Sequence, residues 1–235
     1  MSKNSEKLVS TPKNLQVLFE DNHLLIVNKR AGDIVQGDVT GDMPLSEIAK
    51  EYIAEKYQKP GAVFLGVVHR LDRPTSGIIV FARTSKALTR LNKLFAERQT
   101  EKTYWAIIKN APPRDSETLI HYLKRNPKQN KSYAHTKEVD ESKRAVLTYQ
   151  VLKKLTNYFL LEIALETGRH HQIRSQLSAI GCPIKGDLKY GFDRSNKDGS
   201  IHLHARKLSF IHPVKKEPLS IIAPTPKEVL WIAAN

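Results

Sequence analysis

The amino-acid sequence predicts an α+β fold on a mainly antiparallel sheet, and three observations lead to this prediction. Short β-branched and aromatic runs occur in pairs separated by turn residues, as they do in hairpins. Segments with helical periodicity are scattered between these pairs, so the strict strand–helix alternation of a doubly wound fold is missing. The 235 residues, 40% of them hydrophobic, suffice for one substantial core and show no bias toward disorder.

The first elements expected are a leader, a hairpin and a helix. Residues 1–14 form a polar leader, which we expect to be flexible. Two apolar runs, Leu15–Glu20 and His23–Asn28, flank the turn dipeptide Asp-Asn and predict a hairpin. The segment Gly32–Asp42 is rich in Gly and Asp and predicts a loop, after which apolar residues at helical spacing predict a helix over about Pro44–Tyr57.

The middle of the chain predicts two strands around a loop. Val63–Val68 and Ile78–Phe81 are short β-branched runs, and the segment between them, His69–Gly77, is too rich in charge, Pro and Gly to be a central strand. Ser85 is positioned to cap a following helix, and Thr103–Ile108 is expected to be the next strand.

The last third begins with a polar, basic stretch, Asn110–Lys143. It fits either an RNA-facing insertion or a solvated hairpin. Further strands and one helix are expected after it. The strands are Ala145–Leu152, Tyr158–Leu165, His202–Ile211 and Leu219–Ile222, and the helix is His171–Ile180.

The charge of the chain points to a polyanionic partner. Lys and Arg number 38 against 24 Asp and Glu, which leaves a formal net charge of +14. Such a surface attracts nucleic acid and releases its counterions on binding. A soluble basic protein, or one drawn to anionic lipid, would carry the same charge, so the motifs have to decide.

Cysteine and histidine usage argues against disulfides and metal sites. Cys182 is the single cysteine, so the chain has neither an internal disulfide nor the ligands of a Cys-based zinc site. No signal peptide and no run of 18 apolar residues is present, which favours a cytoplasmic protein without membrane contact. His202, His204 and His212 superficially resemble a metal triad, but strand histidines are usually packing residues, and we expect no metal.

The densest group of reactive side chains is His69–Gly77, with the sequence His-Arg-Leu-Asp-Arg-Pro-Thr-Ser-Gly. Asp72 stands between Arg70 and Arg73, and opposite charges nearby favour its ionised form. An ionised carboxylate in a rigid loop suits a nucleophile or a base better than a proton donor. The alternative is a turn residue in surface ion pairs.

A second group, Thr167–Arg174, enters the helix predicted at His171. The apolar stripe of this helix is Ile173, Leu177 and Ile180, and Arg174 falls beside that stripe. A guanidinium turned toward the core needs an acid or a phosphate as partner, because an unpaired buried charge is costly. Alternatively, the side chain extends its charged end into water.

These two segments and Lys102–Ala106, with the sequence Lys-Thr-Tyr-Trp-Ala, resemble the three signature motifs of the RluA family of pseudouridine synthases. The run His69–Gly77 follows the pattern H-R-L-D-x-x-T-S-G without a break. The run Gly168–Arg174, followed by Gly186 and Asp187, resembles the pattern G-R-x-H-Q-I-R with its later G-D. The resemblance extends over almost the whole chain.

The resemblance implies an isomerase on a mixed, mainly antiparallel, curved sheet with flanking helices. It identifies Asp72 as the catalytic aspartate, Tyr104 as the tyrosine against the target base and Arg174 as the basic partner of Asp72. It also implies that neither cofactor nor metal is needed. The residues expected to bind substrate are Lys29, His69, Arg70, Arg73, Arg169 and His171.

The chain departs from the family pattern near its N-terminus. It reads Lys29-Arg30-Ala31-Gly32 where many relatives read Lys-Pro-Ala-Gly, and it is too short before that point for a separate RNA-binding domain. We therefore expect a single catalytic domain, residues 15–235, which acts as a monomer on a stem-loop of ribosomal or transfer RNA. The alternatives are a noncatalytic RNA-binding protein and a hydrolase that uses Asp72, although no G-x-S-x-G, Walker or zinc pattern supports the latter.

Overall fold

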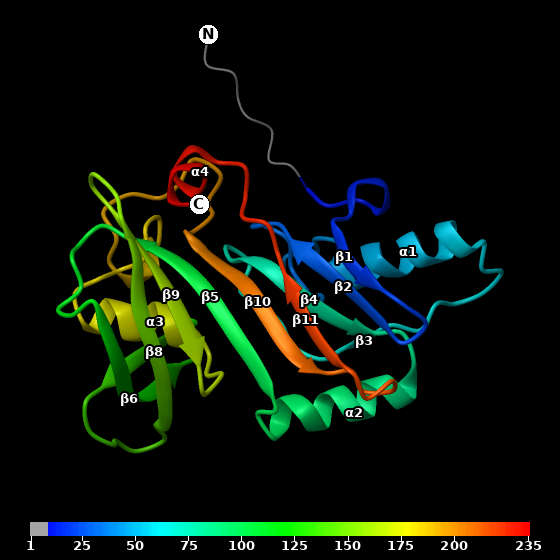
Figure 1. The fold of residues 1–235 in the computed structure, drawn as a ribbon, viewed down its shortest axis with the longest axis horizontal. Helices are drawn as coiled ribbons and strands as arrows, with labels where there is room; N and C mark the ends of the chain where they lie inside the picture. Colours follow the sequence, from blue (N-terminus) through cyan, green and yellow to red (C-terminus); the bar gives the residue numbers. More distant parts are fainter. Residues whose placement is uncertain (1–8) are drawn as a thin grey trace, which may run out of the picture. The chain divides into compact units, whose positions relative to one another are not determined.

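The computed structural model describes residues 9–235, which divide into two compact units (Figure 1). Unit 1 combines the chain up to Thr100 with Arg206–Pro226, and unit 2 combines Glu101–Ala205 with Lys227–Asn235. Both consist of mainly antiparallel strands with few helices, which confirms the predicted α+β class. The expected single catalytic domain stays a prediction. None of the helices in residues 9–235 has the length and hydrophobicity of a membrane span.

The N-terminal segment of unit 1 is held by side chains. Most of the predicted leader lies outside the described residues, but its end includes the short 3-10 helix Pro12–Asn14. The Ser10 hydroxyl donates to Asp33 over 2.6 Å and accepts a bond of 2.9 Å from Arg30. Arg30 also donates to the carbonyl oxygen of Asn14 over 3.0 Å. The residue that replaces proline in the Lys-Arg-Ala-Gly segment therefore ties the N-terminal segment to the loop after the first hairpin.

The sheet of unit 1 has the strand order β1-β2-β4-β10, with β3 paired to β4 and β11 paired to β10. Its strands are β1 Val17–Glu20, β2 Leu24–Lys29, β3 Gly66–Val67, β4 Ser76–Ala82, β10 Leu203–Ile211 and β11 Pro218–Ile222. Two helices accompany them, α1 Leu45–Tyr57 and α2 Ser85–Ala96. The first three residues of β10 belong to unit 2 and the rest to unit 1.

Most of the elements expected in unit 1 are confirmed, with two corrections. The strand expected over Val63–Val68 comprises only Gly66–Val67. Val63 and Leu65 pack into the core without strand pairing, so their apolar character reflects burial and not a longer strand. The cap of α2 is Thr84 rather than Ser85: the Thr84 hydroxyl accepts a hydrogen bond of 3.2 Å from the amide of Ala87.

The core of unit 1 lies on both faces of β2 and β4. Alternate residues of a strand point to opposite faces, so the apolar run Leu24–Val27 of β2 serves two cores. On one face, Leu24 and Ile26 pack in the cluster that contains Leu91 of α2. On the other face, Leu25 and Val27 pack in the cluster that contains α1 residues.

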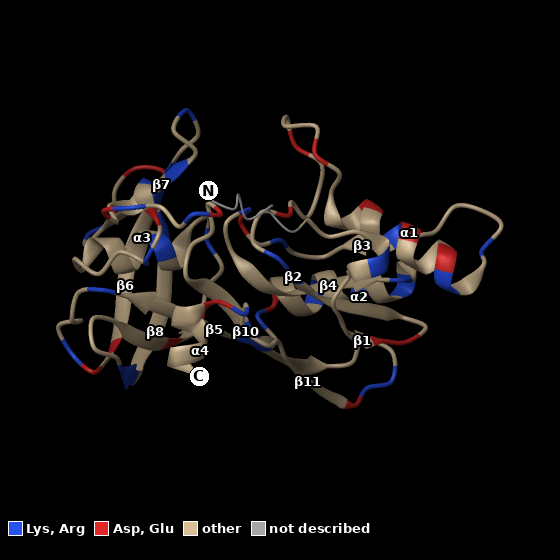
Figure 2. Ribbon diagram, turned by 90° about the horizontal axis from the view of Figure 1, so that it is seen from above, with Lys and Arg blue, Asp and Glu red and all other residues tan. Residues whose placement is uncertain are grey.

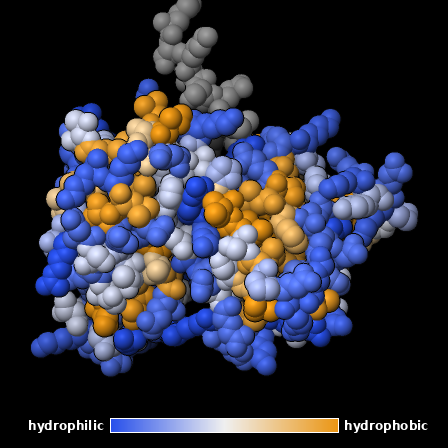
Figure 3. Space-filling view, viewed as in Figure 1, coloured by the Kyte–Doolittle hydropathy of each residue, from blue (hydrophilic) through white to orange (hydrophobic). Residues whose placement is uncertain are grey.

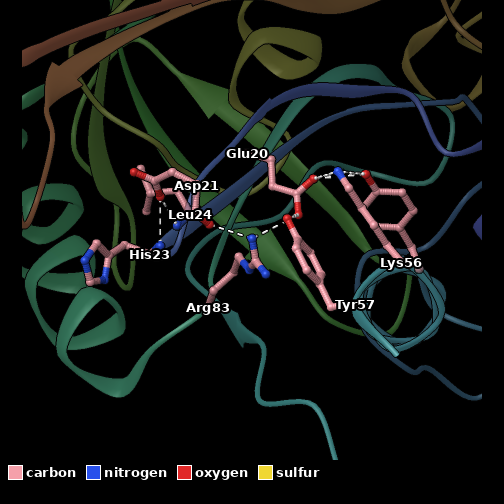
Figure 4. Close-up of polar contacts among 8 residues, drawn as sticks. Glu20, Asp21, His23, Leu24, Lys56, Tyr57 and Arg83 are labelled. Atoms are coloured by element: carbon pink, nitrogen blue, oxygen red, sulfur yellow. Dashed lines mark hydrogen bonds and ion pairs between the residues drawn. The ribbon is translucent and has the colours of Figure 1, made fainter. Parts of the chain in front are cut away.

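A polar network at the end of β1 joins the same elements (Figure 4). The Glu20 carboxylate accepts hydrogen bonds from Lys56 at 2.6 Å, Tyr57 at 2.8 Å and Arg83 at 2.9 Å. Burial alone would raise the pKa of Glu20, but the bonds from Lys56, Tyr57 and Tyr52 outweigh it and lower the pKa. The network links β1 to α1 and to the residue that follows β4.

Unit 2 contains an antiparallel sheet in the order β5-β9-β8-β6-β7. Its strands are β5 Thr100–Ile108, β6 Ser116–Asn126, β7 Lys131–His135, β8 Lys143–Lys154 and β9 Phe159–Leu165. Its helices are α3 Gln172–Ala179, the 3-10 helix Leu188–Tyr190 and the unpredicted α4 Val229–Ala234. The predicted strand pair and α3 are confirmed, and the polar stretch 110–143 contains the hairpin β6–β7.

Two apolar clusters form the core of unit 2. Helix α3 places Ile173 and Leu177 in a cluster with residues of β5, β6, β8 and β9. A smaller cluster surrounds Trp231 of α4, on which the His202 ring stacks with centroids 5.4 Å apart. His202 also pairs with Glu228 at 3.0 Å, yet burial lowers the pKa of His202. Within residues 9–235, no group of three side chains is placed to hold a metal ion.

Lysine and arginine residues are spread over both units, as Figure 2 shows. Helix α3 carries a single one, Arg174. On the face drawn in Figure 3, hydrophilic residues predominate and apolar groups lie between them. Basic residues therefore occur in each unit, and the figures do not single out one part of the chain as the region that binds a partner.

Candidate active site

Asp72 lies in unit 1, in the loop that leads from β3 into β4. The amide of Thr75 donates to the carbonyl oxygen of Asp72 over 3.0 Å, which closes a turn over residues 72–75. Asp72 is partly buried, and β4, the strand that follows, is buried along its whole length. A turn fixed to a buried strand gives Asp72 a defined backbone position, as the sequence predicts.

Lys29, at the end of β2, holds this turn from inside. Its side chain is only 1% exposed, and its ammonium group donates to the carbonyl oxygens of Thr75 at 2.7 Å, Arg30 at 2.9 Å and Arg73 at 3.2 Å. The amide of Gly32 donates to the same Arg73 carbonyl over 2.7 Å. Because Arg73 and Thr75 follow Asp72 within three residues, Lys29 fixes the loop directly after it. Its predicted contact with substrate stays a prediction.

His69 is anchored to the neighbouring core. Its Nε2 atom accepts a hydrogen bond of 3.0 Å from the amide of Val80 in β4. Its ring stacks on Phe95 of α2 with centroids 4.8 Å apart. These contacts give the start of the Asp72 loop a fixed orientation, and they do not test its predicted role in substrate binding.

The two arginines beside Asp72 have different surroundings. Arg70 is exposed. Arg73 donates to Asp42 at 2.5 Å and to Thr40 at 2.7 Å, and its guanidinium lies 3.4 Å from Asp38. Hydrogen bonds from Thr40 and Arg73 lower the pKa of Asp38. Arg73 therefore connects the Asp72 loop with the loop over residues 38–42.

In unit 2, Arg174 forms a buried bidentate pair with Asp187. Its Nε atom lies 2.7 Å from Asp187 Oδ2 and its Nη2 atom 2.9 Å from Oδ1. The two residues are 5% and 1% exposed. Two parallel bonds fix the guanidinium plane as well as its position. The acid partner expected for a guanidinium turned toward the core is therefore present, and within unit 2 it is Asp187.

The backbone conformation at Gly186 explains why a glycine stands immediately before Asp187. Its φ of +88° lies in the left-handed region, and a Cβ atom there would come within 2.8 Å of Asn196 and of the Ser200 carbonyl oxygen. The turn therefore needs glycine. In the Gly-Asp pair of the motif, Gly186 thus forms the turn and Asp187 is the ion-pair partner of Arg174. The sequence alone did not reveal these roles.

Tyr190 lies against the Arg174 guanidinium, and His171 and His170 are close to Tyr190. The Arg174 guanidinium lies 4.9 Å from the centre of the Tyr190 ring. The Tyr190 hydroxyl lies 3.0 Å from His171 Nδ1 and accepts a bond of 2.8 Å from the amide of Ser132 in β7. His171, with φ +52°, is the residue immediately before α3, and its ring stacks on His170 with centroids 3.8 Å apart. Tyr190 is the residue of this group that sequence reasoning missed.

Gln172 organises the segment that carries Arg169. Its side-chain oxygen accepts bonds from the Thr167 hydroxyl at 2.8 Å and from the Arg169 amide at 2.9 Å. The Arg169 side chain donates to the carbonyl oxygen of Arg144 over 3.2 Å. Gln172 therefore shapes the loop before α3, and Arg174, two residues later, enters the core.

Tyr104 lies on β5 opposite Ile163 of β9. Its ring is partly buried and packs against the main apolar cluster of unit 2. A side chain held on a strand paired with β9 and packed on the core has little freedom, which suits a residue that has to present a ring face in a fixed direction.

Comparisons with known proteins agree with these motifs. The sequence matches the model of the family described as RNA pseudouridylate synthase over residues 23–179. An uncharacterized RNA pseudouridine synthase of Chlorobaculum parvum is 35% identical, with 92% of this chain and 72% of that protein covered. The ribosomal large subunit pseudouridine synthase D of Xylella fastidiosa is 31% identical, with 94% and 69% covered. The solved structure of human RNA pseudouridylate synthase domain containing 4 covers 92% of this chain and 90% of its own, at 25% identity and a TM-score of 0.75.

Proposed function

The chain belongs to the RNA pseudouridylate synthase family, of the RluA type, and on that premise we propose that it isomerises specific uridines of structured RNA with Asp72 as catalytic carboxylate. The observation that carries the assignment of Asp72 is its backbone setting. A turn held by the buried Lys29 ammonium, on a strand with no exposed residue, presents one carboxylate within an unbroken family motif.

The reaction needs one carboxylate and no net oxidation or reduction. The bond between ribose C1′ and uracil N1 breaks, the uracil turns, and C1′ rejoins it through C5. The proton on C5 is then lost and N1 becomes protonated. Asp72 either attacks C1′ or removes a proton from the ribose, and both steps require an ionised carboxylate at a fixed distance from the sugar.

Tyr104 and Arg174 have supporting roles in this proposal. Tyr104 presents its ring to the target base, since its strand position limits its movement. Arg174 supplies the positive charge that keeps the catalytic carboxylate ionised. Its bidentate bond to Asp187 fixes the direction of the guanidinium, so that little rearrangement is needed when the uridine binds.

The RNA contacts divide between exposed and buried cations. Among the residues expected to bind substrate, Arg70 is exposed, and Arg73 and Arg169 are partly exposed, so we assign them to phosphates. Lys29 and His171 are buried, and His69 bonds to β4, so we assign these three to positioning the two motif segments. A stacked uridine has to be flipped out at a cost of a few kcal/mol, which phosphate contacts help to offset.

The substrate RNA is proposed to be ribosomal or transfer RNA. A relative named ribosomal large subunit pseudouridine synthase D supports the first. The target is identified by mapping pseudouridines in total RNA from cells that lack the protein, complemented with wild type or with Asp72→Asn. The substitution keeps the shape of the side chain and removes its charge.

We expect one or a few sites to vanish in the deletion strain and to return only with wild type. Purified Asp72→Asn should have the melting temperature of the wild type, which excludes unfolding as the cause. Rescue by Asp72→Asn would contradict the catalytic role. If no site vanishes, the chain uses its basic surface for noncatalytic RNA binding.

A further inference from the structure

Unit 2 contains a basic cavity that none of the motifs includes. It has a volume of about 480 Å³ and is lined by Lys109, Tyr158, Lys185, Phe192, Asp193 and Arg194, among others. Lys109 follows β5, Tyr158 precedes β9, and the other four belong to the segment around and after Asp187. The volume lies in the range of pockets that hold small ligands.

Cations dominate the charge of this cavity. Lys109, Lys185 and Arg194 are opposed by Asp193, whose carboxylate lies 3.4 Å from the Lys109 ammonium. Lys109 and Arg194 are exposed, so they can follow a mobile phosphate. The cavity therefore attracts anions, and a phosphate would compete with the single carboxylate.

Lys185 is the most firmly placed of the three cations. It is partly buried, and its ammonium donates to the side-chain oxygen of Asn196 over 2.5 Å. Asn196 in turn bonds to His202 Nδ1 at 3.0 Å. The backbone of Lys185 is fixed on both sides, because its amide donates to Ile107 and its carbonyl oxygen accepts from His202, each over 2.9 Å.

Two aromatic rings stand among these cations. Tyr158 and Phe192 are partly buried, and Tyr158 packs against the cluster around Trp231. The amide of Phe192 donates to the carbonyl oxygen of Asp187 over 3.0 Å, which fixes the segment that carries the ring. Cations for the backbone and ring faces for the bases are the combination that binds single-stranded nucleic acid.

We propose that this cavity binds one unpaired nucleotide of the substrate RNA, distinct from the uridine that is modified. Its phosphate contacts Lys109, Lys185 and Arg194, and its base stacks on Tyr158 or Phe192. The inference rests on the proposed function for the identity of the RNA. It adds a second contact that selects substrates with a single-stranded nucleotide near the target.

The test measures RNA binding separately from catalysis. All variants are made in the Asp72→Asn protein, and the probes are a labelled twelve-nucleotide uridine oligomer and the stem-loop found by mapping. Lys109→Ala/Arg194→Ala removes two exposed cations of the cavity. The matched control Lys86→Ala/Lys93→Ala removes two exposed lysines of α2. Phe192→Leu keeps apolar bulk and removes the ring.

We expect Lys109→Ala/Arg194→Ala to weaken binding about tenfold and to reduce the slope of log K against log salt by up to about 0.7, since one phosphate lies in the cavity and each neutralised phosphate of a single strand contributes roughly 0.7. The control Lys86→Ala/Lys93→Ala should change both the affinity for RNA and the salt slope by less than this. Phe192→Leu should weaken binding several-fold at an unchanged slope, because stacking does not release counterions.

Equal effects of the cavity variant and the control would overturn the proposal. Pseudouridine formation by the same variants in the Asp72 background is scored separately. If the cavity variants bind normally while Asp72 protein still modifies RNA, the cavity inference fails and the proposed function stands.

Discussion

Glu20 in unit 1 and Asp187 in unit 2 are both carboxylates with little exposure that are held by a guanidinium. Their partners differ, and the comparison shows which of the two ion pairs is only structural. Glu20 accepts from Lys56 and Tyr57 of α1 and from Arg83, which follows β4. Asp187 makes a bidentate pair with Arg174, thirteen residues before it. The Glu20 partners belong to no motif, whereas Arg174 and Asp187 both do. A buried ion pair alone is therefore no sign of a site.

The largest effect is expected from breaking the Asp187 pair. Arg174→Met leaves the Asp187 carboxylate buried without its guanidinium and should lower the free energy of unfolding by about 3–5 kcal/mol, measured by urea denaturation. A loss below about 1 kcal/mol would mean that solvent or another group already compensates the carboxylate.

A double variant sharpens this prediction. Arg174→Met/Asp187→Leu removes both charges, and apolar replacement of a buried pair is often neutral or stabilising, so most of the lost stability should return. Pseudouridine formation should stay absent, because the proposed charge beside the catalytic carboxylate is missing. Recovery of activity together with stability would reduce Arg174 to a structural role.

A smaller effect is expected at Glu20. Glu20→Gln keeps the shape of the side chain but weakens its bonds to Lys56 and Arg83, which should cost about 1–3 kcal/mol at pH 7. The folded protein holds the pKa of Glu20 below its ordinary value of 4.5, so the ionised form contributes stability above that value. This contribution disappears as pH falls through the folded pKa.

Denaturation of wild type and Glu20→Gln at pH 7 and near pH 3 measures this dependence. The difference between the two proteins should shrink at the lower pH. If the difference in the free energy of unfolding between wild type and Glu20→Gln is the same at both pH values, the lost stability comes from altered packing and not from the charge of Glu20. Activity per folded molecule should not change, in contrast to Arg174→Met.

The smallest effect is expected from the exposed ion pairs of Arg73. Arg73→Ala loses its bonds to Asp42 and Thr40 and should lower the free energy of unfolding by no more than about 1 kcal/mol, because water screens exposed pairs. A thermal melt at low and high salt measures this. A larger loss would show that Arg73 holds the Asp72 loop as firmly as the buried Lys29 does.

The sequence predicted those features in which local pattern and tertiary contacts agree. The apolar β2 and β4 runs are buried on both faces, so their pattern sufficed. In β6 the buried and exposed residues alternate among polar side chains, and the strand was hidden within a basic stretch. At the site, the need of Arg174 for an acid was predictable from its helix position, but the identity of Asp187 depended on the Gly186 turn.

Lys29 shows where sequence reasoning reached its limit. A lysine is usually exposed, and nothing local indicates that three carbonyl oxygens surround its ammonium. One carbonyl belongs to Arg30, next to Lys29, and the other two belong to the Asp72 loop more than forty residues away. Such a contact exists only once the chain has folded. A single sequence therefore identifies the Asp72 motif but not the lysine that fixes its loop.

The discontinuity of the two units has a consequence for synthesis on the ribosome. Unit 1 starts with the first strands of the chain but also requires Arg206–Pro226, which supply Leu208, Phe210 and Ile221 to its core. While residues 101–205 are being translated, β4 and α2 have emerged without these partners and expose apolar surface. Folding intermediates with such surface are prone to aggregate. We therefore expect the nascent chain to need protection by chaperones until β10 and β11 leave the ribosome.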